Sequence, residues 1–374
     1  MKRVPEVSVW LVLGLVLPAE IRAQARWTVD ARPSVDIKGV SPSGDVAFGV
    51  ALGATRLSNG NLVVLDGGQP GLRFFDSSGR LSKTIGRGGQ GPGEFRVVYW
   101  LGQCARDTLF VWDPPQQRMT VFDAGGGVVT SFRPSGNEIL WLACSRSGAI
   151  GYAGTPPRDR TLRTGPPGAS YAFLSGRSKV FLIDTKGAET ATLADALGVE
   201  MILPGRGGFP RPLGRPMSFA ISATRVFVAA ADSSAIHVYG LDGKRQASVS
   251  LRVPERKSTK SQYEAATDAI LLFAPAQVRD QARARLMEIP APTLLPPLSA
   301  VFTDLDGLLW VQLSVQGDPD TQFRVVRAEG AVVAEVRVPM NLTVYEIGAD
   351  YILGSRQDPD GEQHVVMFRL RRGQ

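Results

Sequence analysis

The feature that most constrains the fold is a short signature that recurs along the chain. It consists of two apolar residues, a short polar stretch and a glycine, and in the first five copies the glycine lies four residues after the second apolar residue. Runs rich in β-branched and aromatic residues precede and follow most copies, as expected for strands on either side of a turn. The copies are residues 74–80, 121–127, 182–188, 238–244, 325–331 and 367–373. A recurring strand–turn–strand unit predicts a repeat protein.

The spacing of the copies predicts the type of repeat. Measured at the second apolar residue, successive intervals are 47, 61, 56, 87 and 42 residues, and a four-stranded propeller blade takes roughly 40–50 residues. The 61-residue interval contains a loop rich in Pro, Gly and Arg at 154–170, and the 87-residue interval contains two helical patterns, 261–273 and 276–289. We therefore predict an all-β fold, a six-bladed β-propeller of four-stranded antiparallel blades. A helical insertion at about 257–290 lies between blades 4 and 5.

A propeller has to close into a ring, because unpaired sheet edges would otherwise be exposed. The sixth copy of the signature is one residue longer than the others and ends at Gly373, which leaves no room for an outer strand after it. The segment 26–40 precedes the first blade and has no meander of its own. We predict that this segment supplies the missing strand.

The first 25 residues have the pattern of a signal peptide. Lys2 and Arg3 precede a twelve-residue apolar run at 7–18, and Ala23 and Ala25 stand where a signal peptidase reads small residues. Twelve apolar residues are fewer than the roughly 20 that span a bilayer; an uncleaved anchor is the alternative. We predict export of residues 26–374 as one domain, periplasmic or secreted, with no membrane span in the mature chain.

The charge and the cysteine content limit the kinds of ligand and partner that the chain can bind. The net charge is +7, no lysine-rich run is present and the arginines are dispersed, so nucleic acid is not predicted as a partner. The chain is also predicted to be a monomer. The two cysteines, Cys104 and Cys144, lack the further ligands of a zinc site. In an exported chain they could form a disulfide or remain two buried thiols.

The segment IGRGGQGPGEF, residues 85–95, contains the spacing G-x-G-x-x-G. In a dinucleotide-binding fold a helix would follow this motif, but here a strand-like run follows at 97–101. The pattern instead predicts a connection between blades. Within it, Glu94 is expected to bond backbone donors, and Phe95 is expected to pack between blades.

Residues 60–95 resemble an NHL-type repeat, with an apolar-Asp-x-x-Gly turn followed by the loop G-x-G-x-G-P-G-x-F. The chain most closely resembles the exported bacterial six-bladed β-propeller proteins, in which this loop is prominent. The likeness is specific over 60–95, fair over 108–134 and 224–252, and loose elsewhere. The resemblance implies a fold and export, and it implies no particular activity.

Catalytic chemistry has few candidates in this chain. With only His237 and His364, neither a Ser/His/Asp triad nor the histidine-dependent chemistry of similar lyases can be assembled, and both histidines are interpreted as surface or packing residues. A calcium-dependent lactonase is the remaining enzymatic possibility, because calcium takes oxygen ligands. Its candidate ligands are Asp66, Asp113, Asp304 and Asp306, and the alternative is that these aspartates cap turns.

Arginines in the blade connections form the other candidate site. Connections and middle turns project from the same end of a propeller, where a rim of arginines could bind carboxylate or phosphate groups. The alternative is a set of scattered, solvated charges. The residues are Arg87, Arg118, Arg206, Arg211 and Arg215.

These patterns favour a non-catalytic binding or scaffolding module that presents one loop face to a protein, peptide or glycan and needs no cofactor. The alternative is a calcium-dependent, lactonase-like hydrolase or lyase with its site in the central channel. The two differ in a simple way. An enzyme should have converging carboxylates in the channel, whereas a scaffold should have an apolar or neutral channel.

Overall fold

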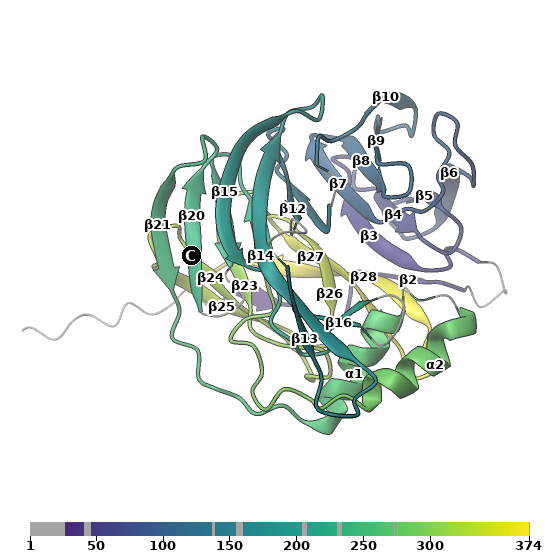
Figure 1. Cartoon of the computed structure of the whole chain (residues 1–374). Coiled ribbons are helices and arrows are strands. Elements are labelled where there is room, and N and C mark those ends of the chain that lie inside the picture. Colours follow the sequence, from purple (N-terminus) through teal and green to yellow (C-terminus); the bar gives the residue numbers. More distant parts are fainter. Residues whose placement is uncertain are drawn as a thin grey trace, which may run out of the picture.

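The computed structural model describes residues 27–40, 46–136, 139–154, 160–203, 208–229, 234–272, 274 and 276–373. Strands in these ranges form six antiparallel sheets, numbered sheet 1 to sheet 6 in chain order, together with two helices (Figure 1). The fold is an all-β propeller of antiparallel, mainly four-stranded sheets. The predicted signal peptide, residues 1–25, lies outside the described residues. Among the described residues, no helix has the length and apolar character needed to cross a membrane.

Four sheets are simple four-stranded meanders, each ordered as in the sequence. Sheet 1 contains β3 (Ala51–Arg56), β4 (Leu62–Asp66), β5 (Gly71–Phe75) and β6 (Leu81–Ile85). Sheet 2 contains β7 (Trp100–Ala105), β8 (Thr108–Asp113), β9 (Arg118–Phe122) and β10 (Val128–Phe132). Sheet 4 contains β18 (Ser218–Ile221), β19 (Arg225–Ala229), β20 (Ala235–Gly240) and β21 (Arg245–Ser250). Sheet 5 contains β22 (Ala300–Thr303), β23 (Leu309–Gln312), β24 (Thr321–Val326) and β25 (Val332–Val338).

Sheets 3 and 6 elaborate this plan. Sheet 3 contains β11 (Trp141–Cys144), β12 (Ile150–Gly154), β13 (Arg160–Thr164), β14 (Ala172–Ile183), β15 (Glu189–Leu197), β16 (Met201–Leu203) and β17 (Phe209–Pro210). Sheet 6 contains β26 (Thr343–Ile347), β27 (Tyr351–Gln357) and β28 (Gln363–Arg371), with β1 (Thr28–Val29) and β2 (Val35–Lys38) from the other end of the chain. Part of the predicted 154–170 loop is therefore a strand, because β13 pairs with the long β14.

The sheets follow one another around an axis. The first strand of each sheet contacts the first strand of the next, in the closed cycle β3, β7, β11, β18, β22, β26 and back to β3. Six buried apolar clusters lie between neighbouring sheets, one for each pair of neighbours. The hydrophobic core is therefore divided among the interfaces between sheets, and each sheet buries both of its faces.

The repeated signature forms hairpin turns in its first five copies. In each, the glycine N–H donates to the carbonyl three residues earlier. The glycine φ lies between 79° and 96°, a conformation that glycine adopts readily because it has no Cβ. These glycines are Gly79, Gly126, Gly187, Gly243 and Gly330. The sixth copy was predicted wrongly as a hairpin, because β28 continues through it to Arg371.

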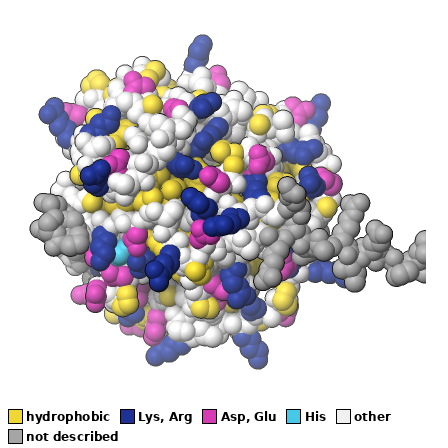
Figure 2. Space-filling model, turned by 180° about the vertical axis from the view of Figure 1, so that it is seen from behind, with side chains coloured by type: hydrophobic (Ala, Val, Ile, Leu, Met, Phe, Trp, Pro, Cys, Tyr) yellow, Lys and Arg dark blue, Asp and Glu magenta, His cyan; other side chains and the backbone are white. Residues whose placement is uncertain are grey.

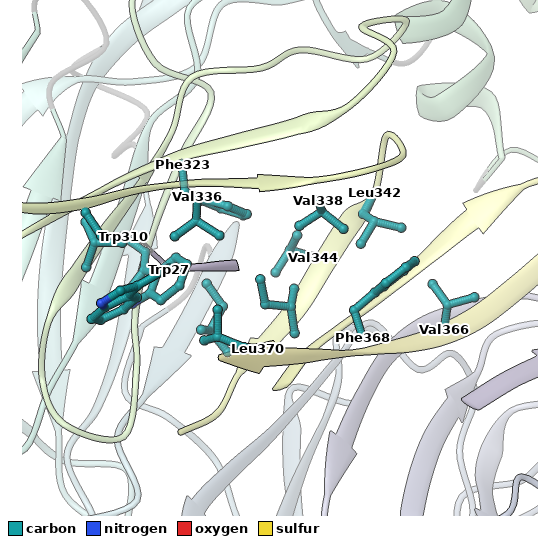
Figure 3. Close-up of a cluster of buried hydrophobic side chains, with 14 residues drawn as sticks. Trp27, Trp310, Phe323, Val336, Val338, Leu342, Val344, Val366, Phe368 and Leu370 are labelled. Atoms are coloured by element: carbon teal, nitrogen blue, oxygen red, sulfur yellow. The ribbon is translucent and has the colours of Figure 1, made fainter. Parts of the chain in front are cut away.

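The N-terminal segment completes sheet 6, and this prediction is confirmed. Strand β2 pairs with β28 over residues 364–367, and β1 pairs with it at residues 370 and 371. Trp27 inserts between sheets 5 and 6, with its ring 5.7 Å from that of Trp310 (Figure 3). Val35 and Ile37 pack into the interface between sheets 6 and 1. One short segment thus contributes to the two interfaces that join the ends of the chain.

The predicted helices are present as α1 (Lys260–Leu271) and α2 (Ala276–Met287), which lie in the chain between β21 and β22. Thr259 caps α1, and its hydroxyl and the Gln262 side chain form a reciprocal capping box. Leu271 of α1 and Leu286 of α2 pack against Ile202 of β16. The helices lie together at one end of the ring, beside β13 and β16 (Figure 1).

The glycine-rich segment 85–95 connects sheets 1 and 2, and both expectations about its side chains are confirmed. Glu94 Oε2 accepts a hydrogen bond from the Gly91 N–H, and Phe95 is fully buried in the cluster between the two sheets. Gly86 has a positive φ of 90°, and a Cβ there would lie 3.0 Å from the Phe95 ring. Glycine at this position therefore allows the backbone to turn away from the outer strand β6 and to pass close to the buried Phe95 ring.

A buried ion pair fixes the turn of sheet 1. Asp66 Oδ1 accepts backbone hydrogen bonds from Gly49, Val50 and Gly68, and Oδ2 is bound by two nitrogens of Arg73, at 3.1 and 2.8 Å. The Asp66 side chain has no exposed surface, and that of Arg73 is 7% exposed. The pair thus ties the start of sheet 1 to its middle strands.

Replacing Arg73 by methionine should destabilise the fold strongly. Methionine keeps much of the volume but leaves the Asp66 carboxylate buried without a cation, which typically costs about 3–5 kcal/mol. Chemical denaturation of Arg73→Met would measure this cost. The control is Arg80→Met, which breaks the exposed pair between Arg80 and Asp76 and should change stability little. Equal effects of the two changes would contradict the role given to the buried pair.

Truncating Ile37 tests the closure of the ring. Ile37 is 4% exposed, so Ile37→Ala should lower the free energy of unfolding by about 2–5 kcal/mol through lost burial and the cavity that remains. Lys38→Ala, at the exposed neighbouring position of the same strand, should stay within about 0.5 kcal/mol of the wild type. Thermal or denaturant unfolding measures both. An Ile37→Ala protein as stable as Lys38→Ala would show that the N-terminal strand is dispensable.

Candidate functional site

The six inner strands enclose a cavity on the propeller axis, here called the axial cavity, with a volume of about 550 Å³. All six inner strands run in the same direction, because each is entered by a connection from the preceding sheet and left by a turn to the next strand of its own sheet. The end at which the inner strands begin is called the connection face, and the end at which they finish is called the turn face. The cavity therefore has two chemically distinct ends.

Aromatic side chains line the end toward the connection face. Trp100 and Trp141 are the first residues of β7 and β11, and both are half-buried. The Trp100 ring lies over Gly102, where an added Cβ would stand 2.2 Å from the ring. The wall continues inward with Phe219 and Phe302. An apolar group of a ligand could be buried here.

A disulfide lies in the same wall. It joins Cys104 of β7 to Cys144 of β11, with the two Cα atoms 5.2 Å apart. Cys144 is one of the residues that line the axial cavity. The bond therefore holds the inner strands of sheets 2 and 3 together beside Trp100.

An ion pair spans the axis near the turn face. Arg146 follows the end of β11, and its guanidinium donates to Glu346 of β26 at 3.0 Å and to the Arg56 carbonyl at 3.2 Å. Sheets 3 and 6 lie opposite each other in the cycle of inner strands. Arg146 therefore reaches across the channel and, with Glu346, forms a charged crossbar near its turn-face end.

Glu346 is held from several sides. Its carboxylate accepts hydrogen bonds from the Thr55 hydroxyl, the Arg56 N–H and the Tyr351 hydroxyl in addition to Arg146. The side chains of Arg146 and Glu346 are 25% and 16% exposed. With its lone pairs used in this way, Glu346 is poorly suited to act as a free base.

Charge and burial shift the pKa values of Arg146 and of two tyrosines near the crossbar. Burial acts to lower the pKa of Arg146, but the interactions with Glu346 and Tyr351 together outweigh it, and the pKa is raised. Burial, and then the charge of Glu346, raise the pKa of Tyr351. Burial also raises the pKa of Tyr345, another residue of the cavity wall, to about 12. These groups therefore stay protonated through neutral pH.

The four aspartates predicted as calcium ligands lie in three separate turns. Asp66 and Asp113 end the second strands of sheets 1 and 2, whereas Asp304 and Asp306 lie in the turn between β22 and β23. Asp113 Oδ2 accepts from the Arg96 N–H at 2.8 Å and from the Gln116 side chain at 2.6 Å. Both oxygens of Asp66 are likewise engaged, as described above. Capping and pairing account for each of these two carboxylates.

Asp304 reaches the axial cavity but is also occupied. Its Oδ1 accepts from two backbone N–H groups of its own turn, and its Oδ2 accepts from the Trp310 indole and from Arg372, each at 2.9 Å. Asp306 pairs with the same arginine at 2.6 Å. Among the described residues that line the cavity, Asp304 and Glu346 are the carboxylates. Each is paired with an arginine, and they do not form a converging set.

The predicted arginine rim is divided among separate contacts. Arg87 pairs with Glu94, Arg118 donates to the carbonyls of Gln90 and Glu94, and Arg211 pairs with Glu200 at 2.9 Å. Arg215 is exposed, and Arg206 lies outside the described residues. On the face shown in Figure 2, basic and acidic side chains are interspersed. Arg87 and Arg118 both bind the loop that contains Glu94, and these hydrogen bonds hold the loop together.

Sequence reasoning missed Arg146, Glu346 and Tyr351. They lie in three short segments, CSRSG, YEIG and DYIL, which look like ordinary strand ends. The repeat pattern could have indicated that inner strands end near them. It could not have indicated that Arg146 crosses the axis.

No protein-family model matches the chain, and no curated protein matches it in sequence. Among solved structures, it is similar to a Bacteroides fragilis protein assigned provisionally as exported, with 12% identity over 93% of this chain and 96% of that one, at a TM-score of 0.50. It is also similar to a member of the DUF4221 family from Bacteroides vulgatus, with 9% identity over 94% and 100% of the two chains, at a TM-score of 0.50. A streptogramin B lyase matches at 11% identity over 93% and 98%, at a TM-score of 0.41. At such identities, the first two likenesses establish a shared fold and nothing about activity.

Proposed function

We propose that this protein is an exported six-bladed β-propeller with NHL-like repeats that acts as a non-catalytic binding module. Each sheet is counted as one blade, because the six inner strands contact one another in a closed cycle. Export is supported by the signal-like pattern of residues 1–25 and by the disulfide between Cys104 and Cys144, since disulfides persist in oxidising compartments.

The observation that carries the proposal is the polarity of the axial cavity. Its connection-face end is aromatic, with half-buried Trp100 and Trp141, and its charged groups are already paired with one another. Half-buried tryptophans are the residue type most enriched among binding hot spots. Such a site favours an uncharged, apolar group of the partner.

The segments around the connection-face end of the axial cavity favour a peptide or protein as the partner. The connection face also presents the glycine-rich connection and the helices α1 and α2, because these segments link one sheet to the next. We infer that a partner segment lies against these loops and inserts an apolar side chain between the two tryptophans. The cavity volume of about 550 Å³ is ample for an aromatic side chain.

Trp141→Ala should weaken this binding. Peptides selected from a random display library on the wild-type protein are expected to share an aromatic or large aliphatic anchor. Removing the tryptophan should weaken a selected peptide about 30-fold, the equivalent of a hot spot worth about 2 kcal/mol. Titration calorimetry with one synthetic peptide gives the affinity.

The matched control is Leu162→Ala, which removes an exposed apolar side chain of β13 outside the axial cavity and should leave the affinity unchanged. Trp141→Phe, which keeps an aromatic ring, should retain most of the binding and guards against a folding defect. Selection of no peptide, or equal binding by Trp141→Ala and the wild type, would refute the proposed mode of binding.

The calcium-dependent hydrolase makes a different prediction. A specific site at 100-fold excess of calcium over its dissociation constant would stabilise the fold by about 2.7 kcal/mol. Because Asp66, Asp113 and Asp304 already accept internal donors, we expect the thermal midpoint to be the same with calcium and with chelator. A saturable rise that disappears in Asp304→Asn would favour the hydrolase, and lactones would then be the substrates to screen.

A further inference from the structure

We propose a zinc-binding site, separate from the axial cavity, in the turn between β27 and β28. Its ligands are Asp358, Glu362 and His364, each of which offers one atom, and the three atoms lie within 4.8 Å of one another. No other group of three such side chains meets this criterion in the described part of the chain. The site lies where the N-terminal segment joins sheet 6.

The hairpin positions the first two ligands. Asp358 Oδ1 accepts from the N–H groups of Asp360 and Glu362, at 3.0 and 2.9 Å, and Gly361 has the positive φ of 82° that this tight turn requires. Glu362 Oε1 accepts from the Val40 N–H at 2.7 Å. One oxygen of each carboxylate is thus fixed by the backbone. The other oxygen of each carboxylate is the one that we propose binds the cation.

His364 supplies the decisive feature. Its side chain is 2% exposed, and its Nδ1 lies 2.7 Å from Asp36 Oδ1. Nδ1 also lies 3.1 Å from Arg356 Nη2, which can only donate, and we take the tautomer with the proton on Nδ1, which the shorter contact with the carboxylate favours. Nε2 then carries a lone pair, and its one recorded neighbour among the described residues is another acceptor, Asp358 Oδ2, at 3.3 Å. In that tautomer the buried lone pair faces a carboxylate, and a cation between the two would offset the unfavourable contact.

The distance between the histidine and Asp358 fits zinc. With bonds of about 2.0–2.1 Å to nitrogen and oxygen, neighbouring ligands of a tetrahedral zinc ion are about 3.3 Å apart, which matches the Nε2–Oδ2 separation. A carboxylate bound to the far nitrogen of a ligating histidine is the usual second-shell partner, and Asp36 has this place. Three protein ligands leave a fourth position for water.

The local charge also favours a divalent cation. Asp36, Asp358 and Glu362 bring three carboxylates together, and Arg356 is the basic side chain among their partners, 3.3 Å from Asp36 Oδ2 and 3.1 Å from His364 Nδ1. Lys38, the strand partner of His364, is exposed. Glu362 also lines a surface cavity beside α2, which gives an ion a route to the site.

A doubly protonated His364 would satisfy the same distances, because it would donate to Asp36 and to Asp358. The experiment must therefore distinguish protonation of His364 from binding of a metal ion. The full chain, purified without an affinity tag and stripped with chelator, is titrated with Zn²⁺ by calorimetry. Co²⁺ is used in parallel, since its visible absorption reports tetrahedral coordination and nitrogen ligation.

We expect one Zn²⁺ per chain, tetrahedral Co²⁺ absorption and a higher thermal midpoint with Zn²⁺. His364→Gln should abolish binding, whereas the matched control His237→Gln should bind as the wild type does. Glu362→Gln, which keeps the acceptor for Val40 but removes the charge, should weaken binding at least 10-fold, and Asp360→Asn in the same turn should not. Asp36→Asn should weaken binding about 10–100-fold, as expected for a positioning carboxylate.

Three outcomes would overturn the site. They are no saturable Zn²⁺ binding by the wild type, undiminished binding by both His364→Gln and Glu362→Gln, and nuclear magnetic resonance evidence that both His364 nitrogens stay protonated in excess Zn²⁺. Because Glu362→Gln alters a partly exposed side chain, it keeps the test decisive if His364→Gln fails to fold.

Discussion

The closure of the ring by hydrogen bonds between β28 and the N-terminal strands is the contact on which the other parts depend. Without β1 and β2, the outer edge of sheet 6 would be unpaired, and Trp27, Val35 and Ile37 would leave two of the six interfaces between sheets. A propeller has no central core that could compensate, because its apolar surface is divided among these interfaces. This short segment therefore contributes much more to the stability of the fold than its length suggests.

Ring closure also determines the chemistry on the axis. Arg146 and Glu346 come from opposite sheets, about 200 residues apart in the chain, and can meet only when all the sheets are in place. Their pairing neutralises charges that would otherwise face the channel. The paired charges of the crossbar therefore lie toward one end of the axial cavity, and the tryptophans lie toward the other.

The proposed zinc site lies where the N-terminal strands join sheet 6. Asp36 belongs to β2, Val40 follows it, and the ligands belong to the hairpin of sheet 6. An ion there would link the N-terminal segment to the last sheet through second-shell bonds, in addition to the strand pairing. In this arrangement binding of metal and closure of the ring would be thermodynamically coupled, because a site shared between two segments exists only when both are joined.

The sequence by itself determined the repeat, the positions of the first five hairpin turns, the two helices and the source of the closing strand. These follow from local rules, since apolar alternation, a glycine at positive φ and helix-forming runs act over a few residues. It also indicated that Glu94 and Phe95 serve the connection rather than a phosphate. The sixth signature and the strand β13 were predicted wrongly, because their pairing partners, β1, β2 and β14, decide what those residues become. Only the tertiary structure decided that Arg146 crosses to Glu346, that the four candidate aspartates lie in three separate turns with internal partners, and that His364 faces Asp358 and Glu362. Such contacts depend on how strands from distant parts of the chain meet around one axis, and no spacing within a single blade records that.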